Sequence, residues 1–572
     1  MLYSDQYFLF WNLPMKRLQK LIHLLLGTAV ISLFLFSGSA AAKTADIAFS
    51  EKASDMMIQA LKPEPDKSFL KQLYTELFYL PIWIKKDKPS KVSQELFDII
   101  KSDRSLERTT NLYQNALSLE EEMHQLYDYP SSIVQKINWE FKMSQLYEEY
   151  ANYVIYGSIN WGALQARLSN LRVSAITAGW ITYKPDSSPL QVAENAVLMG
   201  SLKKAFQEAE PRKYHYRALR KYLDKYIAIK ENGGWPTVNI KGVLRPGHRN
   251  PAVPDLRERL LITGDYIPCD ESDESDLYDN CLKKAVIRFQ KRNGLSAKGV
   301  IGKNTLKALN QTVDERITII KINLDRIKWL HERPDNRHII INIPDYRLYY
   351  EVNGKLKMTM KVIVGKRKNP TPIFSNRVKS VVLNPYWNVP KSIIQKEMIP
   401  KLLRNPHAMA GQGIDIYTGW GKDAKKVSGG SVNWAQYRYS KTVPYRFAQR
   451  PGNRNALGRI KFLFPNQFHV YMHDTPTKYL FKRDKRSYSH GCIRLEKPKL
   501  MMETIASFNP SLELDKAYKI LKSKKNTYFS LENTIPIDVV YLTAWVDYDG
   551  KLQFRDDVYK YDELMIASVR RW

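Results

Sequence analysis

The chain has 572 residues, 44% of them hydrophobic and 26% charged, and its 89 Lys and Arg against 58 Asp and Glu give a formal net charge of +31. This length exceeds what one hydrophobic core usually supports, so we expect several domains, and the composition excludes a mainly disordered chain. A net positive charge attracts polyanions over long range. Nucleic acid is the usual first candidate, but the N-terminus argues against it.

Residues 1–42 have the pattern of a signal peptide. Residues 15–20 are basic, residues 21–36 are almost wholly apolar, and residues 37–42 are small, as signal peptidase requires. The apolar stretch is shorter than the roughly 20 residues that span a membrane, although an uncleaved inner-membrane anchor over residues 21–36 stays open. We therefore expect an exported protein of the periplasm or cell envelope, with no nucleic-acid partner.

Residues 43–235 are expected to form a helical scaffold domain. Long stretches such as residues 131–156 contain neither Gly nor Pro, which favours helices. No catalytic motif occurs in this part of the chain. Gly233, Gly234 and Pro236 then mark a domain boundary.

A compact helical unit is expected over residues 236–312. Leu282, Ala285, Val286 and Phe289 recur at the spacing of one buried helix face. The unit resembles the three-helix peptidoglycan-binding domain, although a generic helical bundle with the same periodicity stays open. The residues that carry the resemblance are Leu256 to Leu260, Gly264-Asp265-Tyr266, Ala285 to Gln290, Gly294-Leu295, Gly299 to Gly302 and Thr305.

The chain has three cysteines, and two of them are expected to pair in an oxidising compartment. Cys269 and Cys281 flank the acidic loop 270–276, so we expect a disulfide between them. Cys492 is then an odd thiol, which requires an explanation in an exported chain.

A second helical unit leads into a β-rich domain. An apolar helical stripe predicts a connector helix over residues 313–336. From residue 337 the period changes to the alternation of strands, and Asn353-Gly354 predicts a hairpin turn. We expect a catalytic domain over residues 337–535, interrupted at about 391–455 by a glycine-rich insertion that caps the site, and a C-terminal segment over 536–572. The predicted fold class is multidomain α+β.

One pair of residues in this domain has the chemistry of a nucleophile and a base. His473 is expected at the end of a strand, and Cys492 follows nineteen residues later inside Ser489-His490-Gly491-Cys492-Ile493-Arg494. An imidazole can take the proton of a thiol and so produce the reactive thiolate. The N–H groups of Gly491 and Cys492 are candidates to hold an oxyanion, and Arg494 offers a cation to a carboxylate.

This motif resembles the signature of the L,D-transpeptidase catalytic domain of the large Gram-negative type, which has a capping subdomain. Further matching segments occur in the expected order, and the resemblance covers about residues 337–510. They are Ile343 to Leu348, Val362 to Lys366, Thr371-Pro372, Asn384 to Pro390, Arg450-Pro451-Gly452 and Asn455 to Gly458.

The resemblance implies that Cys492 attacks the bond between the third residue of a tetrapeptide stem, usually meso-diaminopimelate, and its terminal D-Ala. His473 then acts as base and acid, the carbonyl of Asp474 orients it, and an amine of another stem resolves the thioester into a 3→3 cross-link. His490 is expected to shape the site beside the thiol, Ser489 to bind substrate, and carbapenems to acylate the thiol. No cofactor or metal is expected. The aromatic pair Tyr386 and Trp387 is expected to line the donor groove or to belong to the core.

Three alternatives stay open. His469, His473, His490 and Cys492 are zinc-ligand types, although the usual ligand spacing is missing. A wall hydrolase is a second alternative; papain-like enzymes place Cys before His, but an L,D-carboxypeptidase with water as acceptor would use this same site. The third is a peptidoglycan-binding scaffold without activity, which an intact His473 and Cys492 pair disfavours.

Overall fold

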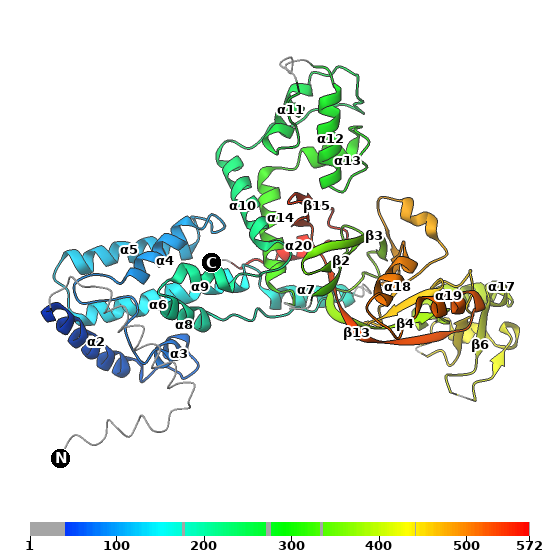
Figure 1. Ribbon diagram of the computed structural model, residues 1–572, viewed down its shortest axis with the longest axis horizontal. Helices are drawn as coiled ribbons and strands as arrows, with labels where there is room; N and C mark the ends of the chain where they lie inside the picture. The colour runs from blue at the N-terminus through cyan, green and yellow to red at the C-terminus, as the bar shows by residue number, and fades with distance from the viewer. Residues whose placement is uncertain are drawn as a thin grey trace.

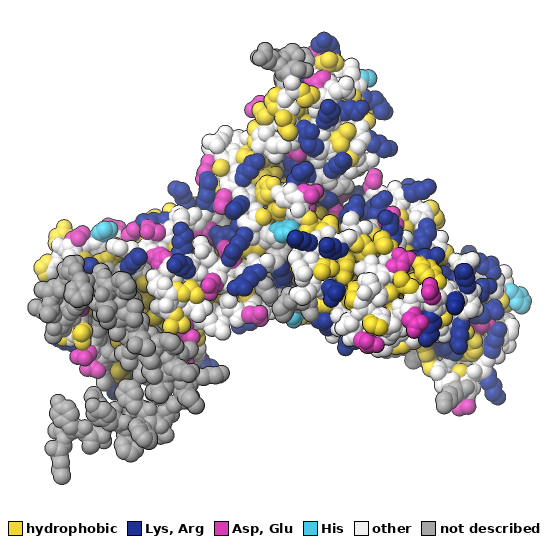
Figure 2. Space-filling model, in the orientation of Figure 1, with side chains coloured by type: hydrophobic (Ala, Val, Ile, Leu, Met, Phe, Trp, Pro, Cys, Tyr) yellow, Lys and Arg dark blue, Asp and Glu magenta, His cyan; other side chains and the backbone are white. Residues whose placement is uncertain are grey.

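The computed structural model describes residues 40–173, 178–269, 276–331, 336–421, 423–440 and 442–570. These residues form five separate hydrophobic cores, which confirms the prediction of a multidomain α+β protein. In Figure 1 the molecule has three arms: a helical arm at the N-terminus, a small helical arm around α11–α13, and a β-rich arm. Lys and Arg side chains are spread over all three arms in Figure 2.

The expected export signal lies almost entirely outside the described residues, where α2 begins at Ala40. Within the described ranges, no helix is both long enough and apolar enough to cross a bilayer.

The N-terminal arm is a bundle of helices with its own core. Its helices are α2 (Ala40–Leu61), α3 (Phe69–Glu76), α4 (Lys91–Ser102), α5 (Asn111–Asp128), α6 (Ile133–Tyr156), α8 (Pro189–Met199) and α9 (Leu202–Ala209). Serine or threonine N-caps start several of them, as at Ser132, whose side chain accepts from the backbone of Gln135. The helix α7 (Trp161–Val173) differs from the rest, because its residues Trp161, Leu164 and Leu168 pack into the core of the β-rich arm. The expected scaffold therefore does not have a single core.

The residue after α6 must be glycine. Gly157 has φ +78°, and a Cβ at this position would lie 2.1 Å from Oδ1 of Asp325 on α14. The same carboxylate accepts from the backbone N–H of Ser158 at 2.8 Å through Oδ2. A side chain here would displace the Asp325 carboxylate from its contact with Ser158, and it would also have to adopt a positive φ that favours glycine.

The helices α10 (Tyr216–Glu231) and α14 (Val313–Lys328) run side by side at the junction of the arms (Figure 1). They carry the small arm, which consists of α11 (Val253–Ile262), α12 (Asn280–Arg292) and α13 (Lys303–Leu309). Leu282, Ala285, Val286 and Phe289 of α12 are fully buried in its core, as their spacing predicted. The structure joins Cys269 to Cys281 by a disulfide beside α12.

The β-rich arm is built on a nine-stranded sheet with the order β11-β3-β12-β10-β9-β4-β13-β1-β2, and a further pairing of β2 with β3 closes it on itself. Its strands are β1 (Arg337–Asn342), β2 (Arg347–Val352), β3 (Lys355–Gly365), β4 (Phe374–Leu383), β9 (Ile460–Leu463), β10 (Met472–His473), β11 (Ser487–Ser489), β12 (Ile493–Leu495) and β13 (Thr527–Val540). Helices η4 (Lys478–Lys482), α18 (Pro498–Ala506) and α19 (Leu514–Ser523) complete the arm.

Strand β13 runs through the boundary expected between residues 535 and 536. Its last residues pair with β1, from Ile537 opposite Ile339 to Val540 opposite Asn342. The sheet therefore ends at Val540, because the residues after 535 supply the parallel ladder partner on one edge of β1.

The capping insertion forms a small subdomain with its own core. It has a four-stranded sheet, β5-β8-β6-β7, formed by β5 (Trp387–Asn388), β8 (Arg446–Gln449), β6 (Ile414–Tyr417) and β7 (Lys426–Val427). A continuous helical stretch lies between β5 and β6, with α15 (Lys391–Ile393), the π-helical turn η1 (Ile394–Met398) and α16 (Ile399–Arg404). The short helices are α17 (Ala408–Gly411), η2 (Gly429–Ser431) and η3 (Trp434–Tyr437).

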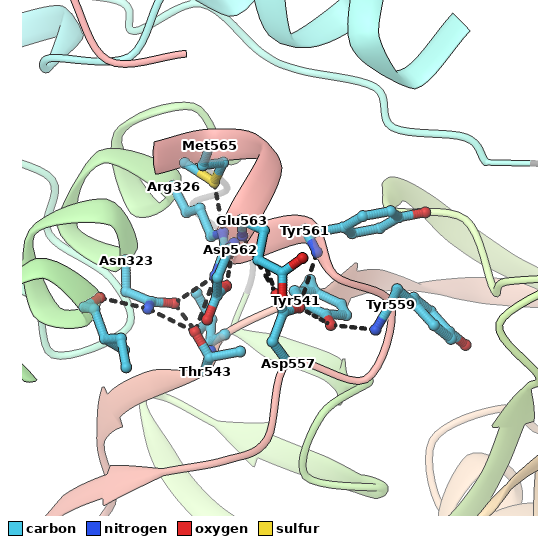
Figure 3. A network of polar contacts seen from close by, with 12 residues as sticks. Asn323, Arg326, Tyr541, Thr543, Asp557, Tyr559, Tyr561, Asp562, Glu563 and Met565 are labelled. Carbon is cyan, nitrogen blue, oxygen red and sulfur yellow. Dashed lines mark hydrogen bonds and ion pairs between the residues drawn. The ribbon is translucent and has the colours of Figure 1, made fainter. Parts of the chain in front are cut away.

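The C-terminal segment adds β14 (Ala544–Val546), β15 (Leu552–Phe554) and α20 (Tyr561–Ile566). Figure 3 shows how polar contacts tie this segment to the connector helix α14. Arg326, 1% exposed, forms an ion pair with Asp562 at 2.5 Å through Nη2, and its Nη1 donates to both Asn323 and Thr543. Each buried charge thus has a partner, as burial in a low dielectric requires.

Candidate active site

Three neighbouring strands bring the predicted residues together on one face of the sheet. In the register, His473 lies opposite Lys461 of β9 on one side and opposite Arg494 of β12 on the other. Because side chains alternate along a strand, Tyr471 and Cys492 project from the same face as His473. Phe462, Met472 and Ile493 point the other way and are fully buried in the core.

His473 is held as a neutral imidazole. Its ring is 4% exposed, and Nδ1 lies 2.5 Å from the carbonyl oxygen of Asp474, so Nδ1–H donates and Nε2 keeps its lone pair. Burial, together with the nearby cations of Arg494 and Lys461, lowers the pKa of His473 to about 3, against the opposing effect of the Asp474 carbonyl. The backbone contact expected from the sequence is thus present in the structure.

Cys492 is the free thiol of the described cysteines. Burial raises the pKa of its thiol, while Tyr471, Lys461 and Arg494 favour the thiolate. Lys461 also lies over the ring of Tyr471, with Nζ 3.8 Å from the ring centroid. Since the pKa of the imidazole is lowered and the pKa of the thiol is raised, both groups favour their neutral forms.

The loop before Cys492 is held by the side chain of Ser489, which is 2% exposed. Its Oγ donates to the carbonyl of Cys492 at 2.5 Å and accepts from the N–H of Gly491 at 3.1 Å. Gly491 has φ +116°, a conformation that favours glycine. The N–H of Gly491, expected to be an oxyanion donor, therefore already has a partner in this structure, because Ser489 closes the turn upon it.

A second set of contacts joins this loop to the segment between β3 and β4. Thr371, fully buried, donates from Oγ1 to the carbonyl of Gly491 at 2.8 Å and accepts from the N–H of Gly365 at 2.9 Å. The hydroxyl of Tyr559 donates to the carbonyl of Gly365 at 2.7 Å and accepts from the N–H of Thr371 at 3.1 Å. The backbone N–H of Tyr559 in turn donates to Tyr541 at 2.7 Å (Figure 3), so the C-terminal segment supports the loop of Cys492.

His490 contacts the capping subdomain. Its Nε2 lies 2.8 Å from Oε1 of Glu397 on η1, and both side chains are partly exposed. Burial lowers the pKa of His490, Glu397 raises it, and the cations Lys366 and Arg494 lower it. This contact joins the cap to the loop that carries Cys492.

Arg494 donates to Oγ1 of Thr477 at 3.0 Å and is close enough to Cys492 to influence its pKa. Tyr386 is 49% exposed, whereas Trp387 packs against the core of the cap. His469 is exposed in a turn before β10. Across the described ranges, no three His, Cys, Asp or Glu side chains gather as a metal site, so the zinc alternative has no support there.

Sequence reasoning did not select Lys461, Tyr471, Thr371 or Glu397. The alternation of strands is a signal that could have found the first two, since each shares a face with His473. Thr371 was noted only as part of a segment that matches the family, without a role at the site. Glu397 lies far from Cys492 in the chain, and no local pattern predicts that the two segments meet.

Three family models match the chain. Residues 336–510 match the L,D-transpeptidase catalytic domain, residues 68–223 match a scaffold domain, and residues 249–309 match a family described as "Putative peptidoglycan binding domain". These matches follow the order of domains expected from the sequence.

A curated protein of Haemophilus influenzae, named "Putative L,D-transpeptidase", is 31% identical over 254 residues, which are 44% of this chain and 50% of that protein. The chain thus spans about half the length of this relative. A solved L,D-transpeptidase from Stackebrandtia nassauensis is 16% identical over 53% of this chain and 96% of its own, with a TM-score of 0.21. One from Mycobacterium smegmatis is 14% identical over 36% and 58%, with a TM-score of 0.17. Because both TM-scores are low, the family models rather than these structures identify the domains.

Proposed function

Since the chain carries an L,D-transpeptidase catalytic domain and a peptidoglycan-binding domain, we propose that it forms 3→3 cross-links between peptidoglycan stem peptides through a thioester on Cys492. The register of β10 with β12 is the observation that carries this proposal, because it puts the imidazole of His473 and the loop of Cys492 on one face. The donor is a tetrapeptide stem, and D-Ala is released.

Acylation uses the neutral pair of thiol and imidazole. As sulfur attacks the carbonyl carbon of the third residue, Nε2 of His473 accepts the thiol proton and a C–S bond forms. Lys461 and Arg494 lie near enough to the sulfur to favour negative charge there, so they also stabilise the oxyanion of the tetrahedral intermediate.

The same imidazole then acts as an acid. Burial and the neighbouring cations disfavour its protonated form, so the imidazolium readily gives its proton to the nitrogen of the departing D-Ala. The C–N bond breaks and the acyl group remains on Cys492. An amine of a second stem next attacks the thioester, whereas water as acceptor would make the enzyme an L,D-carboxypeptidase.

The site lies outside the cytoplasm under this proposal, where tetrapeptide stems occur. The peptidoglycan-binding domain would hold the enzyme on its polymeric substrate. The formal net charge of +31 favours contact with the carboxylates of the wall.

Incubation of the whole protein with tetrapeptide muropeptides, followed by mass spectrometry, tests the proposal. We expect an adduct on Cys492, release of D-Ala and a cross-linked dimer. Cys492→Ala should give none of these while still binding peptidoglycan sacculi. Dimer formation by Cys492→Ala, or a wild-type protein that never acylates, contradicts the proposal.

A further inference from the structure

Lysine and arginine side chains surround the thiol of Cys492. Lys461 and Arg494 both favour the thiolate of Cys492, and Lys366 and Arg494 both oppose protonation of His490. Such surroundings suit anions, namely the carboxylates of a donor stem and the oxyanion of acylation. They do not suit the second substrate of a transpeptidase.

The acceptor of a transpeptidase is an amine, and an alkyl amine with a pKa near 10 is a cation at neutral pH. It has to approach the thioester despite Lys461, Arg494 and Lys366, and it has to lose a proton before its nitrogen can attack. A carboxylate beside the thioester would meet the first need, and a base would meet the second.

Glu397 brings a carboxylate to this loop from the capping subdomain. It belongs to η1, in which Ile394 and Met398 are buried in the core of the cap, as is Ile393 just before it. The side chain of Glu397 stays 45% exposed and reaches His490, two residues before Cys492. π-helical turns are frequent at functional sites, because the extra residue in the turn redirects side chains.

We propose that Glu397 determines acceptor specificity, in that its carboxylate binds the ammonium group of the acceptor stem and holds His490 to receive the ammonium proton. The proposal rests on the function proposed above. His490 donates Nε2–H to Oε1 of Glu397 over 2.8 Å, which leaves Nδ1 as the acceptor atom of the ring and Oε2 of Glu397 for the ammonium.

The acceptor ammonium loses two protons before the new amide is complete. The ammonium gives one proton to Nδ1 of His490, and the carboxylate of Glu397 stabilises the imidazolium that forms. The neutral amine attacks the thioester carbon, so a C–N bond forms and the C–S bond breaks. The nitrogen loses its second proton to the departing sulfur through His473, which restores the thiol. His490 then releases its proton to solvent.

Glu397→Gln is the test variant, with Lys396→Gln as its control. Both change one charge on the same exposed stretch of η1, but only Glu397 contacts His490. Two quantities are measured on the full chain: the rate of Cys492 acylation by a tetrapeptide, and the ratio of cross-linked dimer to hydrolysed tripeptide.

We expect Glu397→Gln to acylate at nearly the wild-type rate while its dimer-to-tripeptide ratio falls at least about tenfold, the lower end of effects from a missing acid–base group. Glu397→Asp should recover part of the ratio. Hydroxylamine, an amine that is neutral at pH 7, should resolve the thioester equally well in the wild type and in Glu397→Gln, because it needs neither a carboxylate nor a base.

An unchanged dimer-to-tripeptide ratio in Glu397→Gln overturns the proposal, and so does an equal loss with Lys396→Gln. A loss confined to acylation would place Glu397 on the donor side and overturn it as well. A wild-type protein that acylates but yields tripeptide alone removes the acceptor role while leaving the nucleophile intact. A wild-type protein that does not acylate contradicts the proposed function itself.

Discussion

Replacing Thr371 by Val tests whether the position of the Cys492 loop depends on the hydrogen bonds of the Thr371 hydroxyl. Valine keeps the shape of the side chain but removes Oγ1, which contacts both the carbonyl of Gly491 and the N–H of Gly365. Thr371 is fully buried, so water cannot replace the hydroxyl. Each buried group left without a partner costs roughly 1–3 kcal/mol, so the two together cost roughly 2–6 kcal/mol.

The protein can respond to this cost in two ways. If the loop moves to find new partners, the thiol of Cys492 shifts relative to His473, and a shift of about 1 Å can slow a reaction about 100-fold. If the loop stays, the melting temperature of the catalytic domain falls. We expect both effects in part, with the acylation rate at least about tenfold lower.

The assay is the rate of Cys492 acylation by a carbapenem, measured by mass spectrometry of the intact protein and accompanied by a thermal melt. Thr371→Ser keeps Oγ1 and should acylate close to the wild-type rate. If Thr371→Val matches the wild type in both rate and melting temperature, the contacts to Gly491 do not position the nucleophile.

Further predictions concern charge in the same arm. Alkylation of Cys492 by iodoacetamide should become faster as the pH rises through 9. Burial raises the pKa of the thiol and lowers the pKa of His473 to about 3, so no thiolate–imidazolium pair forms near neutral pH. A rate plateau between pH 5 and 7 would contradict this. Lys461→Met should move that profile to higher pH, because the lysine favours the thiolate; an unmoved profile argues against its role. Asp562→Asn removes the carboxylate that pairs with the buried Arg326, which should lower the free energy of unfolding by about 3–5 kcal/mol. A thermal melt should then give a lower melting temperature for Asp562→Asn than for the exposed control Glu563→Gln.

The amino-acid sequence by itself determined the features that depend on neighbours in the chain. Helix α12 followed from the spacing of Leu282, Ala285, Val286 and Phe289, since those residues share a face only in a helix. The hairpin between β2 and β3 followed from Asn353-Gly354, where both residues have positive φ. His473 was expected at a strand end and lies at the end of β10. Residue chemistry and spacing selected it together with Cys492 as candidates.

Tertiary structure alone decided what surrounds that pair. The register of β9, β10 and β12 places Lys461, His473 and Arg494 in one row. Thr371 reaches Gly491 across 120 positions of the chain, and Tyr559 reaches Gly365 across 194. Glu397 meets His490 only because the cap folds back over the loop. Contacts at such separations form when whole strands and subdomains pack together. The periodicity of one segment does not predict which distant segment will contact it.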